Sequence, residues 1–309
     1  MPLEFWRRKR IFLTGGTGFF GKSILDQCRR GVLADNTITI LSRDPEAFRQ
    51  ACPSLASLPN VCLVAGDVRT FALPQARFDL IIHAATPIQN PPPEGQRDVI
   101  LRGTEQVLRF ARQCGAEKLL FTSSGEVYGP QPPGVDKIPE TSPCHPVTEY
   151  GIAKYAAEQM LVASGIHTVI ARCFAFTGPY LNRHLHFAIG NFIRDCLAGT
   201  DIIIRGDGTP YRSYLYADDL VDWLLALLDR GESARPYNVG SEAALTILEL
   251  AHQVRAALGT ANGIQVLGVP DPAKAPSRYV PLTERIRREL GVAETIALPE
   301  AIRRSAETR

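Results

Sequence analysis

The chain contains 309 residues, of which 45% are hydrophobic and 21% charged, and it carries a formal net charge of +2. This length can bury one large core or two smaller ones. A charge so close to balance gives no reason to expect nucleic acid or a membrane surface as a partner. No run of about 18 apolar residues occurs, and the N-terminal stretch lacks the apolar segment of a signal peptide, so we expect a cytoplasmic protein.

The seven cysteines are scattered, without a Cys-x-x-Cys pair, and no histidine lies at metal-ligand spacing from them. They are typical of reduced thiols, and we expect no metal site. The basic run at residues 7–10 is interpreted as a solvated lead into the first strand, with a binding patch as the alternative.

Short β-rich runs alternate with longer amphipathic stretches along the first part of the chain, which predicts parallel strands joined by crossover helices. We expect strands at 10–14, 37–41, 61–65, 80–83, 118–122 and 168–172, and helices at 22–30, 97–113 and 150–163. A continuous apolar run such as Leu80-Ile81-Ile82 indicates burial on both faces of the sheet. The predicted fold is therefore α/β, a Rossmann-type doubly wound parallel sheet.

After Arg172 the alternation loosens, and loops containing proline, glycine and aromatic residues appear. We expect a dinucleotide-binding domain at 1–175 and a smaller, partly interleaved C-terminal substrate domain at 176–309, with segments near 205–240 returning to the first domain.

A glycine-rich run, Thr-Gly-Gly-Thr-Gly-Phe-Phe-Gly, covers residues 14–21, directly after the first predicted strand. Gly15 and Gly18 allow the backbone to approach a pyrophosphate, Gly21 permits close helix packing, and the following helix N-terminus faces the anion. Glycine clusters also form ordinary tight turns, but a preceding strand and a following amphipathic stretch favour dinucleotide binding. The residues of this turn assigned to the cofactor are Gly15, Thr17, Gly18, Phe19 and Phe20.

Candidate catalytic residues follow the fifth predicted strand. Ser124 lies just beyond that strand, and Tyr150 and Lys154 are spaced by one helical turn on a single helix face. A phenol with a pKa near 10 is a poor base at neutral pH, but an adjacent ammonium lowers that value. Tyr150 would then take a proton from a substrate oxygen to which Ser124 also supplies a hydroxyl, while hydride leaves to a nicotinamide. Alternatively, Tyr150 merely begins a helix and Lys154 lies on its exposed face.

Further motifs accompany the glycine turn and the Tyr150/Lys154 pair, and they follow one another over about four-fifths of the chain in the order found in one known family. Together they make the chain resemble the extended short-chain dehydrogenases/reductases that act on nucleotide-diphosphate sugars. These motifs are Gly66-Asp67-Val68, His83-Ala84-Ala85, Gly103-Thr104, Ser123-Ser124, Tyr128-Gly129, Arg172, Gly178-Pro179, Gly206-Asp207-Gly208, Tyr216-Ala217-Asp218-Asp219 and Tyr237-Asn238-Val239-Gly240.

The resemblance implies roles for further residues. Asp67 and Val68 would lie near the adenine, and Ala84 and Ala85 near the cofactor backbone. Arg212 would bind the substrate pyrophosphate, for which a guanidinium is well suited, with a surface salt bridge as the alternative. The residues assigned to substrate are Arg212, Ser124, Thr86 and Asn191. The chain departs from the family pattern at Ile100, Ala175 and Thr177, which affects substrate identity rather than the redox machinery.

Glu126 bears on the reaction type. In the nucleotide-sugar 4,6-dehydratases of this family, a glutamate at this position takes the carbon-5 proton of a 4-keto intermediate, which oxidation at carbon 4 has acidified. The preceding position, which carries a polar side chain in those enzymes, is Gly125 here. The alternative is a structural carboxylate that fixes the loop before Tyr128.

The cofactor is expected to be NADP in preference to NAD. Members that prefer NAD place a carboxylate at the end of the second strand, whereas this chain has Ser42 and Arg43 there, with Asp44 one position further on as a possible substitute. A hydroxyl followed by a guanidinium suits a 2′-phosphate.

The sequence thus predicts an NAD(P)-dependent epimerase or 4,6-dehydratase that acts on a nucleotide-diphosphate sugar through a transient 4-keto sugar. An NADPH-dependent 4-keto-sugar reductase and a non-catalytic cofactor-binding regulatory protein are the alternatives. The resemblance suggests a homodimer. The predicted helices at 97–113 and 150–163 also carry more apolar residues than a single stripe facing the sheet requires, although the alternative is that all of these residues belong to the core. Those positions are Val99, Val107, Phe110, Ala153, Ala157, Met160 and Leu161.

Overall fold

The computed structural model describes residues 4–72, 75–86 and 93–307, which form two compact units. The first unit comprises residues 4–129, 144–172 and 221–237, and the second comprises 130–143, 173–220 and 238–307, within the described part of the chain. The expected division at residue 175 therefore differs from the observed one. The return of the chain to the first unit is confined to 221–237. The sequence placed 130–143 in the nucleotide-binding domain, yet this loop packs with the second unit. Because the loop is proline-rich, it has no periodic pattern of apolar residues from which its place in the second unit could have been predicted.

The first unit is built on a seven-stranded sheet in the order β11-β6-β5-β4-β1-β2-β3, and the pairs β1–β2, β2–β3, β1–β4 and β4–β5 are parallel. The chain order reverses between β1 and β4, as in a doubly wound sheet, so the predicted fold class is confirmed. The strands are β1 (Arg10–Thr14), β2 (Thr37–Ser42), β3 (Val61–Ala65), β4 (Leu80–His83), β5 (Lys118–Ser124), β6 (Thr168–Cys173) and β11 (Pro236–Val239).

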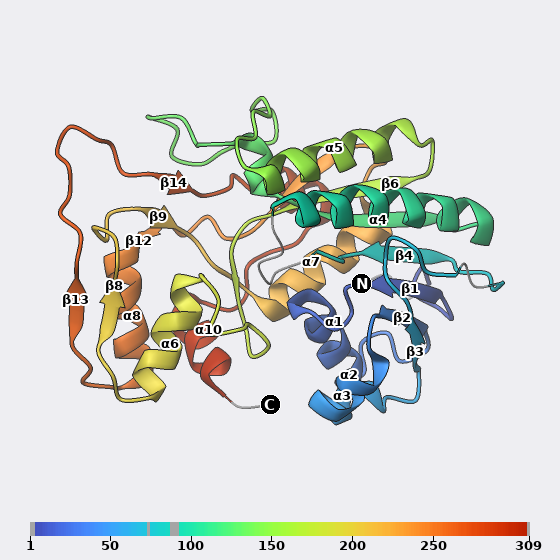
Figure 1. The fold of residues 1–309 in the computed structure, drawn as a ribbon, viewed down its shortest axis with the longest axis horizontal. Helices are drawn as coiled ribbons and strands as arrows, with labels where there is room; N and C mark the ends of the chain where they lie inside the picture. The colour runs from blue at the N-terminus through green and yellow to red at the C-terminus, as the bar shows by residue number, and fades with distance from the viewer. Residues whose placement is uncertain (1–3, 73–74, 87–92, 308–309) are drawn as a thin grey trace. The chain divides into compact units, whose positions relative to one another are not determined.

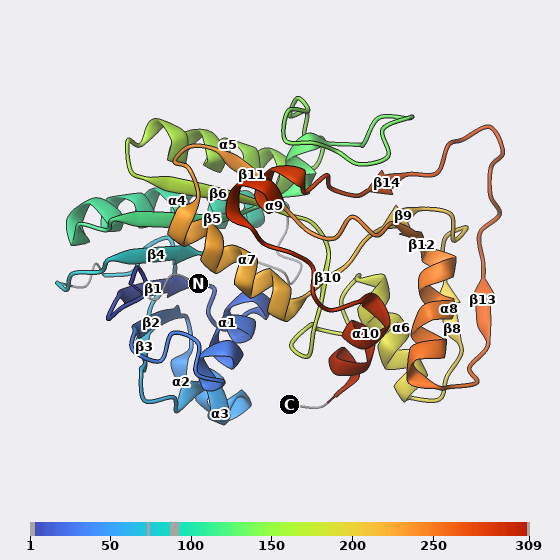
Figure 2. The ribbon, with the colours of Figure 1, turned by 180° about the vertical axis from the view of Figure 1, so that it is seen from behind.

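Helices cover both faces of this sheet. Figures 1 and 2 show α4 and α5 on one face, with α1 and α7 on the other. β4 is buried along its whole length, as expected for a strand between two helical layers. The helices of this unit are α1 (Phe19–Arg29), α2 (Pro45–Ala51), α3 (Pro53–Ala56), α4 (Pro93–Cys114), the 3-10 helix η1 (Gly125–Tyr128), α5 (Glu149–Ala163) and α7 (Ala217–Arg230), whose first turn belongs to the second unit.

A core of apolar side chains fills the space between the sheet and the pair α4–α5. Phe12 on β1 lies at its centre, with its ring centroid 4.6 Å from that of Phe110 and 5.3 Å from that of Phe78. The apolar helix positions from which a dimer face was predicted lie in or against this core of a single chain: Val107, Phe110, Ala153, Ala157 and Leu161 are fully buried, and Val99 and Met160 pack against them. Five of these seven side chains are therefore core residues of one chain, as in the alternative interpretation, and the homodimer stays a prediction.

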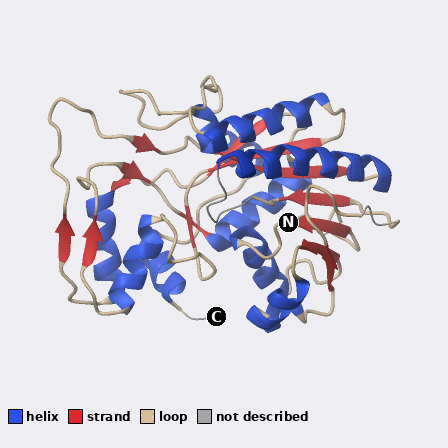
Figure 3. Cartoon of the chain, viewed as in Figure 1, coloured by secondary structure: helices blue, strands red, loops and turns tan. Residues whose placement is uncertain are grey.

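The second unit has short strands and longer loops (Figure 3). Its strands form small sheets, β10–β7, β12–β9–β14 and β13–β8, and a separate apolar core joins α6, α8 and α10. Its elements are β7 (Phe176–Thr177), α6 (Ala188–Leu197), β8 (Ile202–Ile204), β9 (Tyr211–Arg212), β10 (Leu215–Tyr216), β12 (Leu245–Thr246), α8 (Ile247–Leu258), β13 (Ile264–Val266), β14 (Arg278–Tyr279), α9 (Glu284–Leu290) and α10 (Leu298–Ala306).

Within the described residues, no helix has the length and apolar content needed to cross a lipid bilayer.

Candidate active site

The glycine-rich turn connects β1 to α1 at the carboxyl edge of the sheet. Gly15 has a φ of +75°, and a Cβ at this position would overlap the carbonyl group of Ala84 on the neighbouring strand end. Gly18 closes the turn by donating its N–H to the Gly15 carbonyl oxygen at 3.0 Å, and it precedes α1 without a side-chain cap. A helix that begins without a side-chain cap at the end of a glycine turn fits an anionic phosphate group.

Two further glycines explain how the turn fits against its surroundings. Gly21 packs on the backbone of Gly16, and Gly16 packs on the side chain of Ile40 in β2. The close approach expected of Gly21 is therefore made to the turn itself. Gly16 had no assigned role in the sequence, although it lies within the same glycine run.

His83, the last residue of β4, links this turn to helix α4. The Thr104 hydroxyl donates to the Ile100 carbonyl oxygen at 2.7 Å, so its oxygen accepts the hydrogen bond from His83 Nε2 at 3.2 Å. His83 Nδ1 then accepts from the Thr14 hydroxyl at 2.8 Å, and Thr14 Oγ1 accepts the N–H of Ala85 at 3.2 Å. The hydrogen bonds thus place a proton on Nε2, and in the neutral ring Nδ1 is the acceptor for Thr14.

The environment of His83 supports the same protonation state. Its side chain is almost fully buried, and burial, with a smaller contribution from the charge of Lys154, lowers the pKa of His83 to about 3. The neutral ring holds the Ala84–Ala85 segment against the glycine turn. Sequence reasoning noted His83 only as part of a motif and assigned it no function.

The carboxyl ends of β2 and β3 carry the residues expected near the adenosine. Ser42 Oγ accepts the N–H of Asp44 at 3.2 Å, and Asp44 Oδ1 accepts the N–H of Ala47 at 2.9 Å, which caps α2. Asp44 is therefore used as a helix cap, and Arg43 beside it is exposed.

Asp67, after β3, has a partner that the sequence analysis missed. Arg69 donates to both oxygens of Asp67, at 2.8 and 2.9 Å, and reaches Asp98 on α4 at 2.8 Å. The hydrogen bond from Arg69, together with smaller effects that include the charge of Arg43, lowers the pKa of Asp67 to about 2. Val68 is buried against α4 beside Gly103. The adenine contacts of Asp67 and Val68 stay predictions.

The predicted catalytic residues come together at the end of β5 and the start of α5. Ser124 Oγ accepts the N–H of Glu126 at 3.2 Å and so caps η1. Thr148 caps α5 by accepting the N–H of Gly151 at 3.0 Å, and its hydroxyl donates to Glu126 Oε2 at 3.3 Å. Glu126 thereby joins the loop after Ser124 to the first turn of α5, which carries Tyr150.

Lys154 is buried beneath this region. Its Nζ donates to the Thr122 carbonyl oxygen at 2.7 Å and lies 4.6 Å from the ring centroid of Phe121 and 5.9 Å from that of Tyr150. Only 1% of Lys154 is exposed, so the alternative in which this lysine lies on an exposed helix face is wrong. The Lys154 ammonium is therefore a close cationic neighbour of the Tyr150 ring.

Two predicted substrate contacts, Arg212 and Asn191, belong to the second unit. Arg212 donates to the Tyr211 carbonyl oxygen at 2.7 Å, and its guanidinium carbon lies 6.0 Å from the ring centroid of Tyr279 on the adjacent strand β14. Asn191 on α6 accepts from Arg194 at 3.4 Å. Thr86 follows β4 in the first unit, two residues after Ala84. The contacts of all three with a substrate stay predictions.

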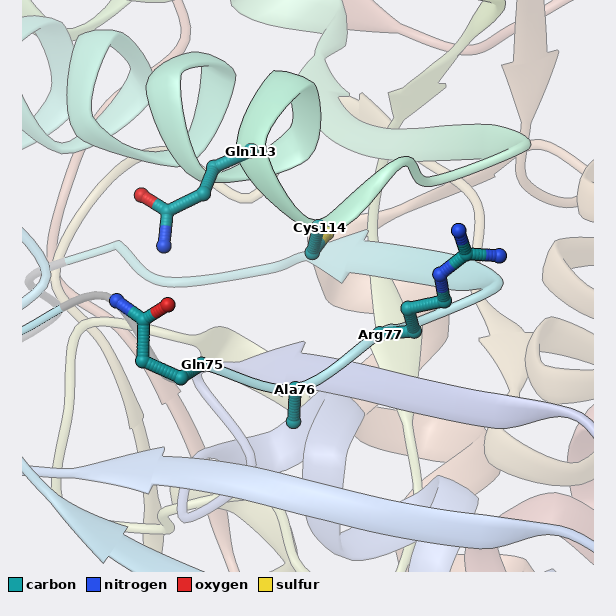
Figure 4. A pocket seen from close by; sticks show the side chains of 5 residues that line it. All are labelled: Gln75, Ala76, Arg77, Gln113 and Cys114. Atoms are coloured by element: carbon teal, nitrogen blue, oxygen red, sulfur yellow. The ribbon is translucent and has the colours of Figure 1, made fainter.

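A small pocket of about 130 Å³ lies at the opposite, amino-terminal edge of the sheet in the first unit (Figure 4). It lies between the segment before β4 and the end of α4, so it contains none of the predicted site residues. Its lining residues are Gln75, Ala76, Arg77, Gln113 and Cys114. Among the residues that the structure describes, no three His, Cys, Asp or Glu side chains are grouped as metal ligands.

The first unit therefore fits a dinucleotide at the carboxyl edge of its sheet. The glycine turn has no room for side chains on the Ala84 side, α1 begins without a cap, and Lys154 is buried between β5 and Tyr150. The residues that would hold the dinucleotide are those of the turn, the Ala84–Ala85 segment and Lys154.

Comparison with known sequences gives a family match over most of the chain. The sequence model described as "NAD dependent epimerase/dehydratase family" matches residues 11–240. The chain is 28% identical over 313 aligned residues to UDP-glucuronic acid decarboxylase 1 of Danio rerio, covering 97% of this chain and 72% of that protein. It is also 28% identical to dTDP-glucose 4,6-dehydratase of Streptomyces niveus, covering 96% of this chain and 92% of that protein.

Solved structures match the fold closely. The UDP-N-acetylglucosamine 4-epimerase from Methanobrevibacter ruminantium has a TM-score of 0.84 and 20% identity, with 97% of each chain covered. The dTDP-glucose 4,6-dehydratase from Bacillus anthracis, solved in complex with NAD, has a TM-score of 0.82 and 20% identity, covering 96% of this chain and 95% of that one. At this identity the likeness establishes the fold.

Proposed function

This chain belongs to the NAD dependent epimerase/dehydratase family, and from that premise we propose that it transforms a nucleotide-diphosphate sugar through a transient 4-keto sugar. An enzyme of this kind oxidises the sugar at carbon 4, carries out a second step on the ketone and ends with its cofactor restored. The observation that carries the proposal is the burial of Lys154 beneath Tyr150, at the end of the strand that presents Ser124.

The first step follows from these three residues. Tyr150, as a phenolate stabilised by Lys154, accepts the proton of the carbon-4 hydroxyl, and the Ser124 hydroxyl donates a hydrogen bond to the same oxygen. The oxidised nicotinamide, when bound, supplies the acceptor for the hydride that leaves carbon 4. The hydrogen bond from Lys154 Nζ to the Thr122 carbonyl oxygen at 2.7 Å holds this side chain in place below Tyr150.

For the second step, the proposal assigns Glu126 as the acid/base group. Its carboxylate is held 3.3 Å from the Thr148 hydroxyl, next to the first turn of α5. Rotation of the 4-keto sugar before the hydride returns gives the epimer and needs no base at carbon 5. Removal of the carbon-5 proton by Glu126 instead permits loss of water from carbon 6, in which case Glu126 also protonates the leaving hydroxide.

A second candidate is decarboxylation of a nucleotide-linked hexuronic acid. The carboxylate of such a sugar is attached to carbon 5, next to the 4-keto group, so it can leave as carbon dioxide. No acid is needed at carbon 6, and this step therefore does not need a side chain at Gly125. Relatives with this activity in their names include the Danio rerio protein. The third candidate is a 4-keto-sugar reductase, which uses the same Tyr150/Lys154 pair but releases its cofactor after each cycle.

For the cofactor we propose NADP in preference to NAD. The carboxylate of Asp44, which could have bonded a ribose diol, caps α2, and the exposed Arg43 is close enough to Asp67 to affect its pKa. We further propose a homodimer, which now depends on the family resemblance alone, and a cytoplasmic location, which fits seven free cysteines.

The deciding experiment is mass spectrometry of UDP-, dTDP-, GDP- and CDP-hexoses and hexuronates incubated with the protein and either cofactor in deuterated water. Loss of water with deuterium uptake identifies a dehydratase, unchanged chemical composition with altered retention an epimerase, and loss of carbon dioxide a decarboxylase. If a 4-keto sugar is reduced stoichiometrically with NADPH, the reductase replaces the first proposal. If no sugar nucleotide is transformed, the proposed function is wrong.

A further inference from the structure

One buried ion pair near the catalytic residues is not used by the reaction described above. Glu158 on α5 and Arg172 on β6 have side chains that are only 2% and 7% exposed. Arg172 Nη2 lies 2.7 Å from Glu158 Oε2, and Arg172 Nε lies 3.1 Å from Glu158 Oε1, so the two groups form a two-pronged pair. Such geometry fixes the relative orientation of both side chains more tightly than a single hydrogen bond does.

The pair contacts both ends of the segment that carries Ser124. At one end, the Ser123 hydroxyl donates to Glu158 Oε1 at 2.5 Å. At the other end, the Arg172 guanidinium carbon lies 4.8 Å from the ring centroid of Tyr128, the last residue of η1. Ser123, Tyr128, Glu158 and Arg172 are all buried, so these contacts are not exchanged with water.

Glu158 also follows Lys154 by one helical turn on α5, and both residues are buried. Each of the three consecutive residues at the end of β5 is therefore held by a different hydrogen bond. Thr122 bonds Lys154 through its carbonyl oxygen, Ser123 bonds Glu158 through its hydroxyl, and Ser124 bonds the N–H of Glu126. The helix that carries Tyr150 is thus fastened to the strand that carries Ser124 at two successive residues.

Stability alone is a weak reason for such a pair. Two charges removed from water lose their hydration, and well-packed apolar side chains of similar volume often stabilise a fold equally well. Apolar side chains, however, do not give Ser123 a directional partner. Because Ser124 and Tyr150 must reach one substrate oxygen, a small sliding of α5 along β5 would separate them.

We propose that the Glu158–Arg172 pair is a positioning device that sets the register of α5 on β5, so that the hydroxyls of Ser124 and Tyr150 converge. Glu158 and Arg172 are positioning residues, since neither is assigned a contact with substrate. The inference rests on the proposed function for its kinetic consequence, but its structural consequence can be measured without a substrate.

The principal test is the double variant E158M/R172M, which removes both charges and leaves neither unpaired. We expect exchange of the Glu126 amide hydrogen, measured by NMR on the protein without substrate, to become at least tenfold faster, because this N–H depends on the placement of Ser124. Unchanged exchange in a folded double variant overturns the proposal, whatever the enzyme's substrate is. The matched control E105M/R109M removes an exposed pair on α4 and should leave this exchange unchanged.

The kinetic test uses the transformed sugar nucleotide. We expect kcat of E158M/R172M to fall roughly 10- to 100-fold with little change in cofactor Kd, since misplacement affects the reacting geometry. The acid limb of the pH profile should not move, because Tyr150 and Lys154 lie on one helix. Ser124→Ala should cost much less in this background than in the wild-type chain. Full additivity of the two changes contradicts a positioning role.

Should the double variant fail to fold, Ser123→Ala provides the second test, since it removes one hydroxyl and keeps the ion pair. We expect faster exchange of the Glu126 amide and a threefold to tenfold lower kcat. Ser57→Ala, which removes an exposed hydroxyl in the same unit, is the matched control. Wild-type exchange and wild-type kcat in Ser123→Ala would overturn the proposal.

Discussion

The two polar clusters at the carboxyl edge of the main sheet are both buried, but they differ in charge. At the ends of β1 and β4, the cluster of Thr14, His83 and Thr104 is neutral, because burial keeps the His83 ring uncharged. At the end of β5, Lys154, Glu158 and Arg172 are charged. The neutral cluster shapes the turn expected to bind the cofactor, whereas the charged cluster holds the residues expected to act on substrate.

This difference in charge predicts which change should disrupt each cluster. A neutral cluster is sensitive to protonation, because a charge formed inside it has no partner. A charged cluster is sensitive to the loss of one partner, because the remaining charge stays buried. Changes in pH and single substitutions should therefore affect the two clusters in different ways.

The largest effect is expected from Tyr150→Phe. Loss of the phenol should lower kcat by about 10²–10⁴-fold, because proton transfer to the substrate oxygen is lost, while the Kd for the cofactor stays the same. Single-turnover kinetics and calorimetric cofactor titration measure the two quantities. Turnover at the wild-type rate would refute the catalytic assignment.

Gly15→Ala should damage the cofactor side selectively. Alanine is strained at a φ of +75°, and its Cβ would overlap the Ala84 carbonyl, so cofactor binding should be lost and the free energy of unfolding should fall by about 1–3 kcal/mol or more. Gly31→Ala is the matched control, since Gly31 has a φ of +95° but a Cβ added there would meet no atom within 4 Å. This control should be strained by φ alone and should bind the cofactor normally. Equal cofactor affinity in both variants would contradict the assignment of the turn.

The pH dependence of stability should reveal His83. Its pKa is about 3 in the folded protein and near 6.5 when unfolded, so its contribution is fully present above pH 6.5 and is lost as pH falls toward 3. As pH falls from 6.5 toward 4.5, the extra loss of the wild-type chain over His83→Gln should approach about 1.4 kcal/mol per pH unit. Asp67, whose pKa is lowered to about 2, contributes stability that is fully present above its ordinary pKa of 3.8 and is lost as pH falls toward 2, so it does not affect the slope between pH 6.5 and 4.5.

Denaturant unfolding at several pH values measures this difference. His252→Gln, which removes an exposed imidazole, should keep the wild-type slope. Parallel curves for the wild-type chain and His83→Gln would show that His83 is not held neutral.

The smallest effect is expected from Arg43→Ala. Loss of an exposed guanidinium should weaken NADP binding by about tenfold, or about 1.4 kcal/mol, and leave NAD binding unchanged. Fluorescence titration with both cofactors tests this expectation. Tenfold tighter binding of NAD than of NADP by the wild-type chain would contradict the proposed preference.

The sequence predicted the main sheet well. β1, β3 and β4 occupy the predicted residues, β2, β5 and β6 extend by one or two residues beyond them, and β11 was not predicted as a strand. Apart from the edge strand β3, which is partly exposed, these strands are buried on both faces and read as short apolar runs, which is a local signal. The two-residue strands of the second unit have no such signal, and their pairing depends on residues far apart in the chain.

The sequence by itself determined the residue types that the chemistry requires, because a glycine turn, a Tyr-x-x-x-Lys pair and a strand-end serine are local patterns. It also carried the family resemblance that the match over residues 11–240 confirmed. Only the tertiary structure decided the partners of the buried polar groups. Glu158 and Arg172 are 14 residues apart, Thr14 and His83 are 69 apart, and Asp67 pairs with an arginine that also reaches α4. A sequence pattern does not predict the partners of such side chains, because a buried polar group forms hydrogen bonds with whichever element the fold packs against it.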